Sequence, residues 1–214
     1  MFYLGADPVD IGLVTSLSQP GGSLTGVVTL NAEVSAKRLE LLYESVPTST
    51  TVALLVNPTS PTLAETITRD LRAAAQNLRL QLHVLQASSE SEFDTAFATL
   101  VQLRAGALVI AADALFNSLS GHLAALTVRH AVPAIYQYRE FVSAGGLMSY
   151  GTNVVDTYRP LGVYTGRILK GEKPADLPVQ QATRLELIIN MKTARALGIS
   201  VPLPLTGRAD EVIE

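Results

Sequence analysis

Residues 51–78, TVALLVNPTSPTLAETITRDLRAAAQNL, decide the fold class of this chain. The run 51–56 is apolar and β-branched throughout and ends at Asn57-Pro58, which is typical of a strand buried on both faces of a sheet. Ser60 followed by Pro61 marks a helix start, because serine caps helices and proline suits their first position. Apolar residues then recur at helical spacing, at Leu63, Ile67, Leu71, Ala74 and Leu78. The stretch therefore predicts one βα unit.

The same order of strand and helix repeats as far as residue 151. Further strands are expected at 80–86, 107–112, 132–136 and 147–150. The helices between them present apolar faces such as that of Phe93, Phe97 and Leu100. Strands joined by helical crossovers of this length are parallel neighbours with right-handed connections. Residues 51–151 are therefore expected to form a doubly wound α/β lobe on a parallel sheet.

The flanks of this lobe do not complete a sheet of their own. They are expected to hold helices at Val9–Leu17, Lys37–Val46, 156–169 and 192–197, strands at 2–4, 25–30 and 185–190, and an extended tail at 201–204. The residues of the helix at 156–169 that are expected to point inward are Tyr158, Leu161, Thr165 and Ile168. These elements look like parts of a second, incomplete lobe.

Composition excludes several classes of protein. The chain has 214 residues, of which 48% are apolar and only 16% charged, so it is not a disordered chain, and no apolar run reaches the ~18 residues of a membrane span. The net charge of −3 and the scattered Lys and Arg residues predict no nucleic-acid partner. The lack of cysteine excludes disulfides and thiolate chemistry. The N-terminus has no basic segment, so we expect a cytosolic protein or a chain that begins after a leader.

The known enzyme motifs are missing from the sequence. Gly145-Gly146 precedes an expected strand, and Lys170-Gly171-Glu172-Lys173 ends an expected helix, so neither forms a phosphate-binding loop. The three histidines, His83, His122 and His130, lack metal-ligand spacing, and no Gly-x-Ser-x-Gly motif occurs. We therefore expect no cofactor, no metal and no catalytic residue, and we predict that the protein is not an enzyme.

Polar and aromatic residues gather instead where the expected parallel strands end, the edge at which open α/β sheets bind ligands. The ligand-binding candidates there are Asn57, Thr59, Ser60, Asp113, Phe116, Asn117, Tyr136, Glu140 and Tyr150. Asp113 would suit a ligand amine, the helix start after Ser60 a ligand carboxylate, and the tyrosines an apolar or aromatic group. The alternative is structural, because Asn57 and Asp113 also form turns and Ser60 or Asn117 also cap helices.

Several segments together resemble a known family. They are GADPV at 5–9, PGGSLTGV at 20–27, KRLELL at 37–42, VNP at 56–58, HAVPAIY at 130–136, GGLMSYG at 145–151, GRILKGEKPADLPVQ at 166–180 and RADEVIE at 208–214. The chain resembles the ABC-transporter substrate-binding family that includes tryptophan- and tyrosine-binding members. The match runs in order over essentially the whole chain.

This resemblance implies a type I periplasmic binding-protein fold, in which two Rossmann-like lobes close about a hinge around a ligand in their cleft. Residues 35–151 would be the complete C-terminal lobe, and residues 1–34 and 152–214 would be remnants of the N-terminal lobe, with Asp7 facing the cleft. Family members begin with a signal sequence and an earlier part of that lobe, which this chain is expected to lack. Open strand edges would then favour a homodimer.

The function expected from the resemblance is binding of a small solute, an amino acid or related carboxylate, for an ABC permease and ATPase complex in the periplasm. A ligand-sensing regulatory domain is an alternative, since lobes of this type also serve as sensors. An enzyme on a doubly wound fold is a further alternative, because fold alone does not fix function.

Overall fold

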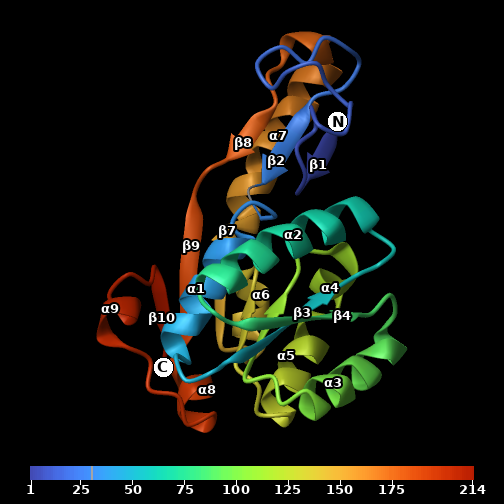
Figure 1. Ribbon diagram of the computed structural model, residues 1–214. Helices are drawn as coiled ribbons and strands as arrows, with labels where there is room; N and C mark the ends of the chain where they lie inside the picture. Colours follow the sequence, from blue (N-terminus) through green and yellow to red (C-terminus); the bar gives the residue numbers. More distant parts are fainter. Residues whose placement is uncertain (30) are drawn as a thin grey trace. The chain divides into compact units, whose positions relative to one another are not determined.

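Two β-sheets organise the chain in the computed structural model, which describes residues 1–29 and 31–214. One sheet has seven strands and the other three (Figure 1). The chain divides accordingly into a smaller unit of residues 1–32 and 152–185 and a larger unit of residues 33–151 and 186–214.

The larger unit is built on the seven-stranded sheet, in the order β10-β9-β7-β6-β5-β3-β4. Its strands are β3 (Thr51–Val56), β4 (Gln81–Gln86), β5 (Ala107–Ile110), β6 (Ala134–Tyr136), β7 (Met148–Thr152), β9 (Leu185–Asn190) and β10 (Glu211–Ile213). Its helices are α1 (Ser35–Ser45), α2 (Pro61–Asn77), α3 (Phe93–Gln102), α4 (Ala114–Ser118), α5 (Ser120–Arg129), α6 (Arg139–Ser143), α8 (Met191–Ala196) and α9 (Leu203–Thr206), with a 3-10 turn at Glu90–Glu92.

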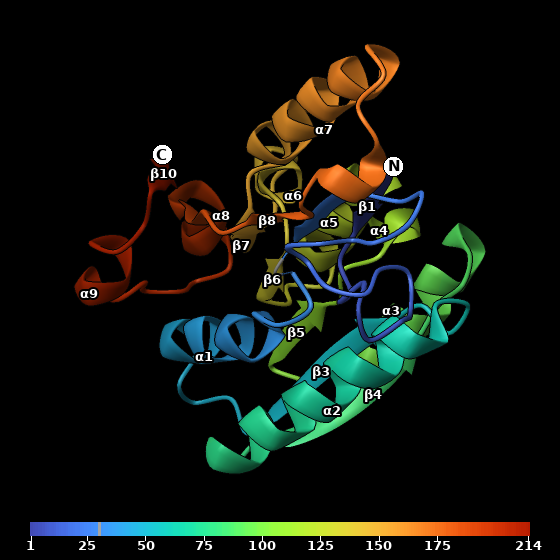
Figure 2. The same cartoon turned by 90° about the horizontal axis from the view of Figure 1, so that it is seen from above.

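The strands from β3 to β7 confirm the predicted doubly wound lobe. β3 pairs in parallel with β4 on one side and with β5 on the other, and β5, β6 and β7 follow as parallel neighbours. Helices lie on both sides of the strands, with α1 and α2 on one side and α5 on the other (Figure 2). Because β3 to β7 all run parallel, the five strands end at the same edge of the sheet.

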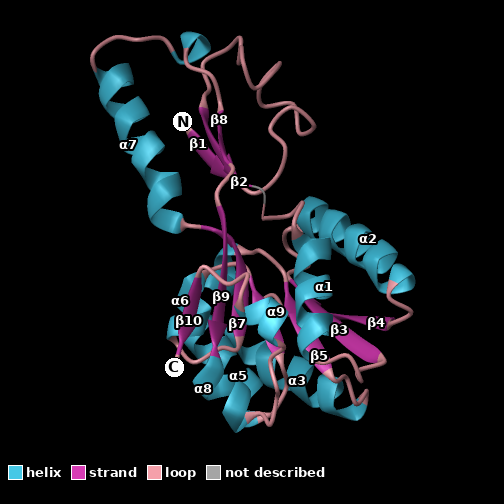
Figure 3. Ribbon diagram, turned by 90° about the vertical axis from the view of Figure 1, so that its left-hand side faces the viewer, coloured by secondary structure: helices cyan, strands magenta, loops and turns pink. Residues whose placement is uncertain are grey.

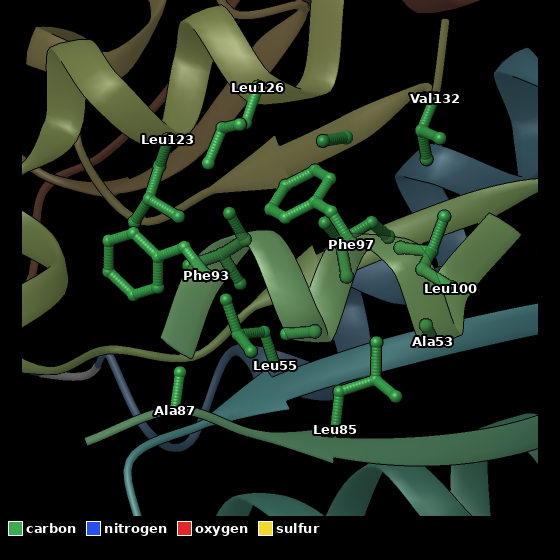
Figure 4. Packing of buried hydrophobic residues seen from close by; sticks show 14 of the residues in the cluster. Ala53, Leu55, Leu85, Ala87, Phe93, Phe97, Leu100, Leu123, Leu126 and Val132 are labelled. Carbon is green, nitrogen blue, oxygen red and sulfur yellow. The ribbon is translucent and has the colours of Figure 1, made fainter. Parts of the chain in front are cut away.

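One hydrophobic cluster fills the face of the sheet under α3 and α5. Ala53 and Leu55 of β3 point into it, as their period-2 spacing requires, and meet Phe93 and Phe97 of α3 (Figure 4). Leu123 of α5 lies against Phe93 in the same view. Both phenylalanines are fully buried, so this cluster fixes the sheet beneath the strand ends.

The smaller unit carries the three-stranded sheet, in the order β1-β2-β8 (Figure 3). The strands β1 (Phe2–Leu4), β2 (Gly26–Thr29) and β8 (Gln180–Ala182) are parallel neighbours. The long helix α7 (Val154–Leu169) packs on β2 and β8 through Leu161 and Tyr164, and a 3-10 turn at Pro174–Asp176 follows it. Tyr158 is 54% exposed and stacks on Tyr3, and Thr165 is exposed too, so the expected inward orientation of these two residues is wrong.

Three further expectations for the flanks are wrong. Val9–Leu17 forms turns and no helix, because Asp7 Oδ1 accepts a bond from Val9 N at 2.7 Å and Gly12 takes a positive φ of 71°. The tail expected to be extended contains α9, and it continues to β10, which pairs with β9. Residues 186–214 therefore belong to the larger sheet and not, as expected, with the remainder of 152–214. Leu30, the last residue of an expected strand, lies outside the described residues.

Among the residues that the structure describes, no helix combines the length and the apolar character needed to cross a membrane.

Candidate functional site

Asp113 holds together the loops that follow β3 and β5. Its Oδ1 accepts from Asn57 Nδ2 at 3.0 Å and from Leu115 N at 2.9 Å, and its Oδ2 accepts from Ser60 Oγ at 3.0 Å. Asp113 is 7% exposed and is the N-cap of α4. The structure thus brings Asn57, Ser60 and Asp113 together at the carboxyl edge, but three protein donors already use the carboxylate. A carboxylate has room for about four hydrogen bonds, so little of its capacity remains for a ligand.

Asn57 and Thr59 form a local turn at the same edge. Asn57 Oδ1 accepts from Thr59 N at 3.0 Å and from Thr59 Oγ1 at 2.8 Å. Ser60 precedes the first residue of α2 but makes no side-chain cap bond, because its hydroxyl donates to Asp113 instead. The first-turn N–H groups of this 17-residue helix are therefore not capped by the Ser60 side chain, and they carry the positive end of the helix dipole.

Asn117 meets a residue that the sequence analysis missed. Gln137 directly follows β6, is fully buried, and donates from Nε2 to Asn117 Oδ1. Gln137 Oε1 has no hydrogen-bond partner among residues 1–29 and 31–214. A buried amide oxygen without a donor is unusual in a folded protein. Its position could have identified Gln137 as a candidate, because it directly follows Tyr136 at the end of an expected strand.

Phe116 and Tyr136 lie inside the hydrophobic cluster and not on its surface. Both are fully buried, and Phe116 packs on Phe93 with ring centroids 5.9 Å apart. The Tyr136 ring stacks on Phe141 at 4.6 Å, and its hydroxyl lies 2.7 Å from Thr127 Oγ1. Burial raises the pKa of Tyr136 far above its ordinary value. Neither ring exposes a surface that a ligand could contact in this conformation.

Tyr150, expected as the last residue of its strand, lies inside β7, which continues to Thr152, and Glu140 is exposed on α6. The Tyr150 carbonyl accepts from Arg38 Nε at 2.7 Å. Arg38 of α1 is fully buried, and this desolvation lowers the pKa of its guanidinium to about 10, while Tyr138 and Tyr150 act in the opposite direction. The spacing of apolar and polar residues in α1 predicts an amphipathic helix, and it gives no indication that Arg38 is buried.

Asp7 belongs to the smaller unit, where it follows β1. It is exposed, and its Oδ1 is used by Val9 N in the turn described above. The structure therefore brings together Asn57, Thr59, Ser60 and Asp113 as one group and Asn117 with Gln137 as another.

The chemistry of this edge is that of hydrogen bonding. In the part of the chain that the structure describes, no group of three or more His, Cys, Asp or Glu side chains could hold a metal ion. Gln137 offers an acceptor, the start of α2 offers donors with positive charge, and Tyr138 and Tyr150 are half-buried. This combination suits a small ligand with an amine, a carboxylate and an apolar group.

Comparison with known sequences gives a family and a relative. The sequence model of the family described as ABC transporter substrate binding protein matches residues 1–213. A tyrosine-binding protein of Clostridioides difficile (strain R20291) is 29% identical over 195 residues, which are 89% of this chain and 54% of that protein. The chain therefore spans about half the length of this curated relative.

Comparison with solved structures gives the same architecture. A crystal structure of an ABC domain in complex with L-Trp from Streptococcus pneumonia has a TM-score of 0.85 and 26% identity, covering 99% of this chain and 71% of that one. A conserved domain protein from Vibrio cholerae also has a TM-score of 0.85, at 24% identity over 96% of this chain and 68% of that one, and so shows the fold alone. The expected type I periplasmic binding fold is confirmed.

Proposed function

We propose that this chain, which belongs to the family of ABC transporter substrate-binding proteins, binds an amino acid or a related carboxylate for uptake across a membrane. The observation that carries the proposal is its likeness to the L-Trp complex, which extends over 99% of this chain at a TM-score of 0.85. The relative named as tyrosine-binding supports the same ligand class.

The carboxyl edge of the larger unit supplies the groups for such a ligand. In this proposal, Gln137 Oε1 accepts from the ligand ammonium group, and the first-turn N–H groups of α2 donate to its carboxylate. Tyr138 and Tyr150 contact its apolar or aromatic side chain. Asn57, Thr59, Ser60 and Asp113 hold the loops in place through the bonds given above.

Asn117 positions Gln137 in this proposal. We keep Glu140 and Asp7 as predicted ligand contacts. We do not include Phe116 and Tyr136 among the ligand contacts, because their rings pack within the hydrophobic cluster and the Tyr136 hydroxyl already pairs with Thr127 Oγ1. Gln137 is equally buried but differs in that its Oε1 has no partner among the described residues, so ligand binding there requires the side chains around it to move. That the solute lies between the two units stays a prediction.

The test uses the absence of tryptophan from the sequence, because L-Trp is then the only indole fluorophore in solution. We expect the fluorescence anisotropy of L-Trp to rise as the protein is added. Gln137→Met should weaken L-Trp binding by about tenfold or more, the usual effect of losing a hydrogen bond to a charged group. The control is Gln102→Met, an exposed glutamine at the end of α3, which should bind as the wild type does.

Two results would count against the proposal. No rise in anisotropy at any protein concentration up to about 1 mM would argue against L-Trp as ligand. Equal binding by Gln137→Met and wild type would remove Gln137 from the site.

The remaining parts of the proposal concern partners and location. We propose that the chain delivers its solute to an ABC permease and ATPase complex, acts in the periplasm, and catalyses no reaction. We also propose self-association in a homodimer, since β1 and β8 are the edges of the three-stranded sheet and unpaired edges favour pairing. Light scattering that shows a monomer at micromolar concentration would refute the dimer alone.

A further inference from the structure

The smaller unit contains a crevice of its own. It has a volume of about 190 Å³ and lies between the first half of α7 and the edge strand β8. Val27 of β2 and Pro160 of α7 give it an apolar wall, and Gln180 and Gln181 of β8 give it a polar one. Its volume suits a compact molecule of a few heavy atoms.

Opposite charges lie at the mouth of this crevice. Asp156 in the first turn of α7 and Arg184 after β8 both line it, with Arg184 Nη1 3.6 Å from Asp156 Oδ2. The two side chains are 45% and 70% exposed. An ion pair this open and this long contributes little to stability, so a ligand can reorganise it at small cost.

Several of the surrounding groups are held by hydrogen bonds to residues other than Arg184. Asn153 caps α7 through Oδ1, which accepts from Val155 N at 2.9 Å and from Asp156 N at 3.2 Å. Gln180 Nε2 donates to the Tyr164 hydroxyl at 3.0 Å, and that hydroxyl donates to Pro178 O at 2.7 Å. The Asp156 carboxylate is therefore not needed to start the helix, and the polar wall is fixed without it.

We propose that this crevice binds an α-amino acid or a similarly compact zwitterion. The ligand lies antiparallel to the protein pair, with its carboxylate on Arg184 and its ammonium on Asp156, so that the four charges alternate in sign around a ring. Within this ring, each charge lies beside two charges of opposite sign. A simple anion is attracted by Arg184 and repelled by Asp156, and a simple cation experiences the reverse. The charge pattern therefore selects zwitterions.

This site is separate from the one proposed for the transported solute, and it does not depend on that proposal. Every residue that lines the crevice belongs to the smaller unit, whereas Gln137 and the start of α2 belong to the larger one. The two sites are therefore tested by different variants.

The test is a titration of the whole ¹⁵N-labelled chain with glycine, followed by amide resonances. Acetate and methylammonium, each with one of the two charges, are titrated in parallel. We expect glycine to shift the amide resonances of Val27, Gln181 and Thr183, and either single ion to do so much less. Arg184→Gln and Asp156→Asn should each raise the dissociation constant for glycine about fivefold or more. The matched control is Arg167→Gln, whose guanidinium pairs with Glu172 at the other end of α7, and it should bind glycine unchanged.

The results of the titration that support the proposal differ from those that overturn it. Shifts at the crevice that weaken in both charge variants and persist in the control support the proposal. Equal shifts with acetate would make this an anion site and overturn the zwitterion class. The absence of crevice shifts up to about 100 mM glycine would overturn the site itself, whatever L-Trp does at the carboxyl edge. Loss of L-Trp binding in Gln137→Met with intact glycine shifts would leave this inference standing.

Discussion

Removal of the Asp113 carboxylate tests whether the carboxyl edge is held together as described. The carboxylate accepts from Asn57 Nδ2, Ser60 Oγ and Leu115 N. Asp113→Ala removes the N-cap of α4, which is worth about 1 kcal/mol. It also leaves the Asn57 amide, which is 7% exposed, without this acceptor, and an unpaired buried donor costs about 1–3 kcal/mol. The half-buried Ser60 hydroxyl can turn to water at little cost.

The expected loss is therefore about 2–4 kcal/mol in the free energy of unfolding. Urea denaturation followed by circular dichroism measures it from the shift in midpoint. Asp113→Asn should lose less, because its amide oxygen can still cap α4. The control is Asp94→Ala, which breaks an exposed pair with Arg129 and should cost no more than about 0.5 kcal/mol. A loss in Asp113→Ala no larger than that of Asp94→Ala would refute the reasoning and return Asp113 to the ligand contacts.

Three further predictions concern the core, the buried tyrosine and the small sheet. Phe97→Ala should lower the free energy of unfolding by about 3–5 kcal/mol in urea titrations, because it empties the centre of the cluster under α3, and a loss below about 1 kcal/mol would contradict that packing. Because burial raises the pKa of Tyr136, the folded state keeps a proton that the unfolded state releases above about pH 10, so stability from this group is present below that pH and lost above it. Tyr136→Phe should therefore lose less stability than wild type between about pH 8 and pH 11, and equal losses would place the ring in contact with water. Gly26→Ala would drive its Cβ into the Phe2 carbonyl and should separate β1 from β2, measured as loss of amide protection at Val27 and Val28 that wild type does not show.

The sequence predicted strands β3 to β7 of the larger sheet well, because the signals there are local and repeat. Thr51–Val56 and the helix from Pro61 have unbroken apolar or helical periodicity, and both elements form where expected. Val9–Leu17 shows helical spacing too, but Pro8 and Gly12 favour turns, and no buried face holds a helix there. Residues 186–214 were wrongly assigned to the second lobe, because β9 pairs with β7 from a distant part of the chain. Local hydrophobic periodicity does not predict which strands pair.

The sequence predicted where the candidate residues lie better than it predicted what they do. Strand ends correctly located Asn57, Ser60 and Asp113 together, because parallel strands end at one edge. Whether such a side chain faces a ligand or its own loops depends on hydrogen bonds across 53 or 56 residues, which local sequence does not show. Tyr136 and Gln137 make the same point, because the sequence does not show that Tyr136 pairs with Thr127 and Gln137, the residue after β6, with Asn117.

Thermal unfolding in the presence of a panel of amino acids tests the central claim most directly. A ligand that binds only the folded state raises the melting temperature by mass action. At about one hundred times its dissociation constant, L-Trp or L-Tyr should add about 2.7 kcal/mol, which for a chain of 214 residues corresponds to a rise of about 5–10 °C. Gln137→Met should reduce this rise, and Gln102→Met should preserve it. A melting temperature that no amino acid or related carboxylate changes at about 10 mM would contradict the account.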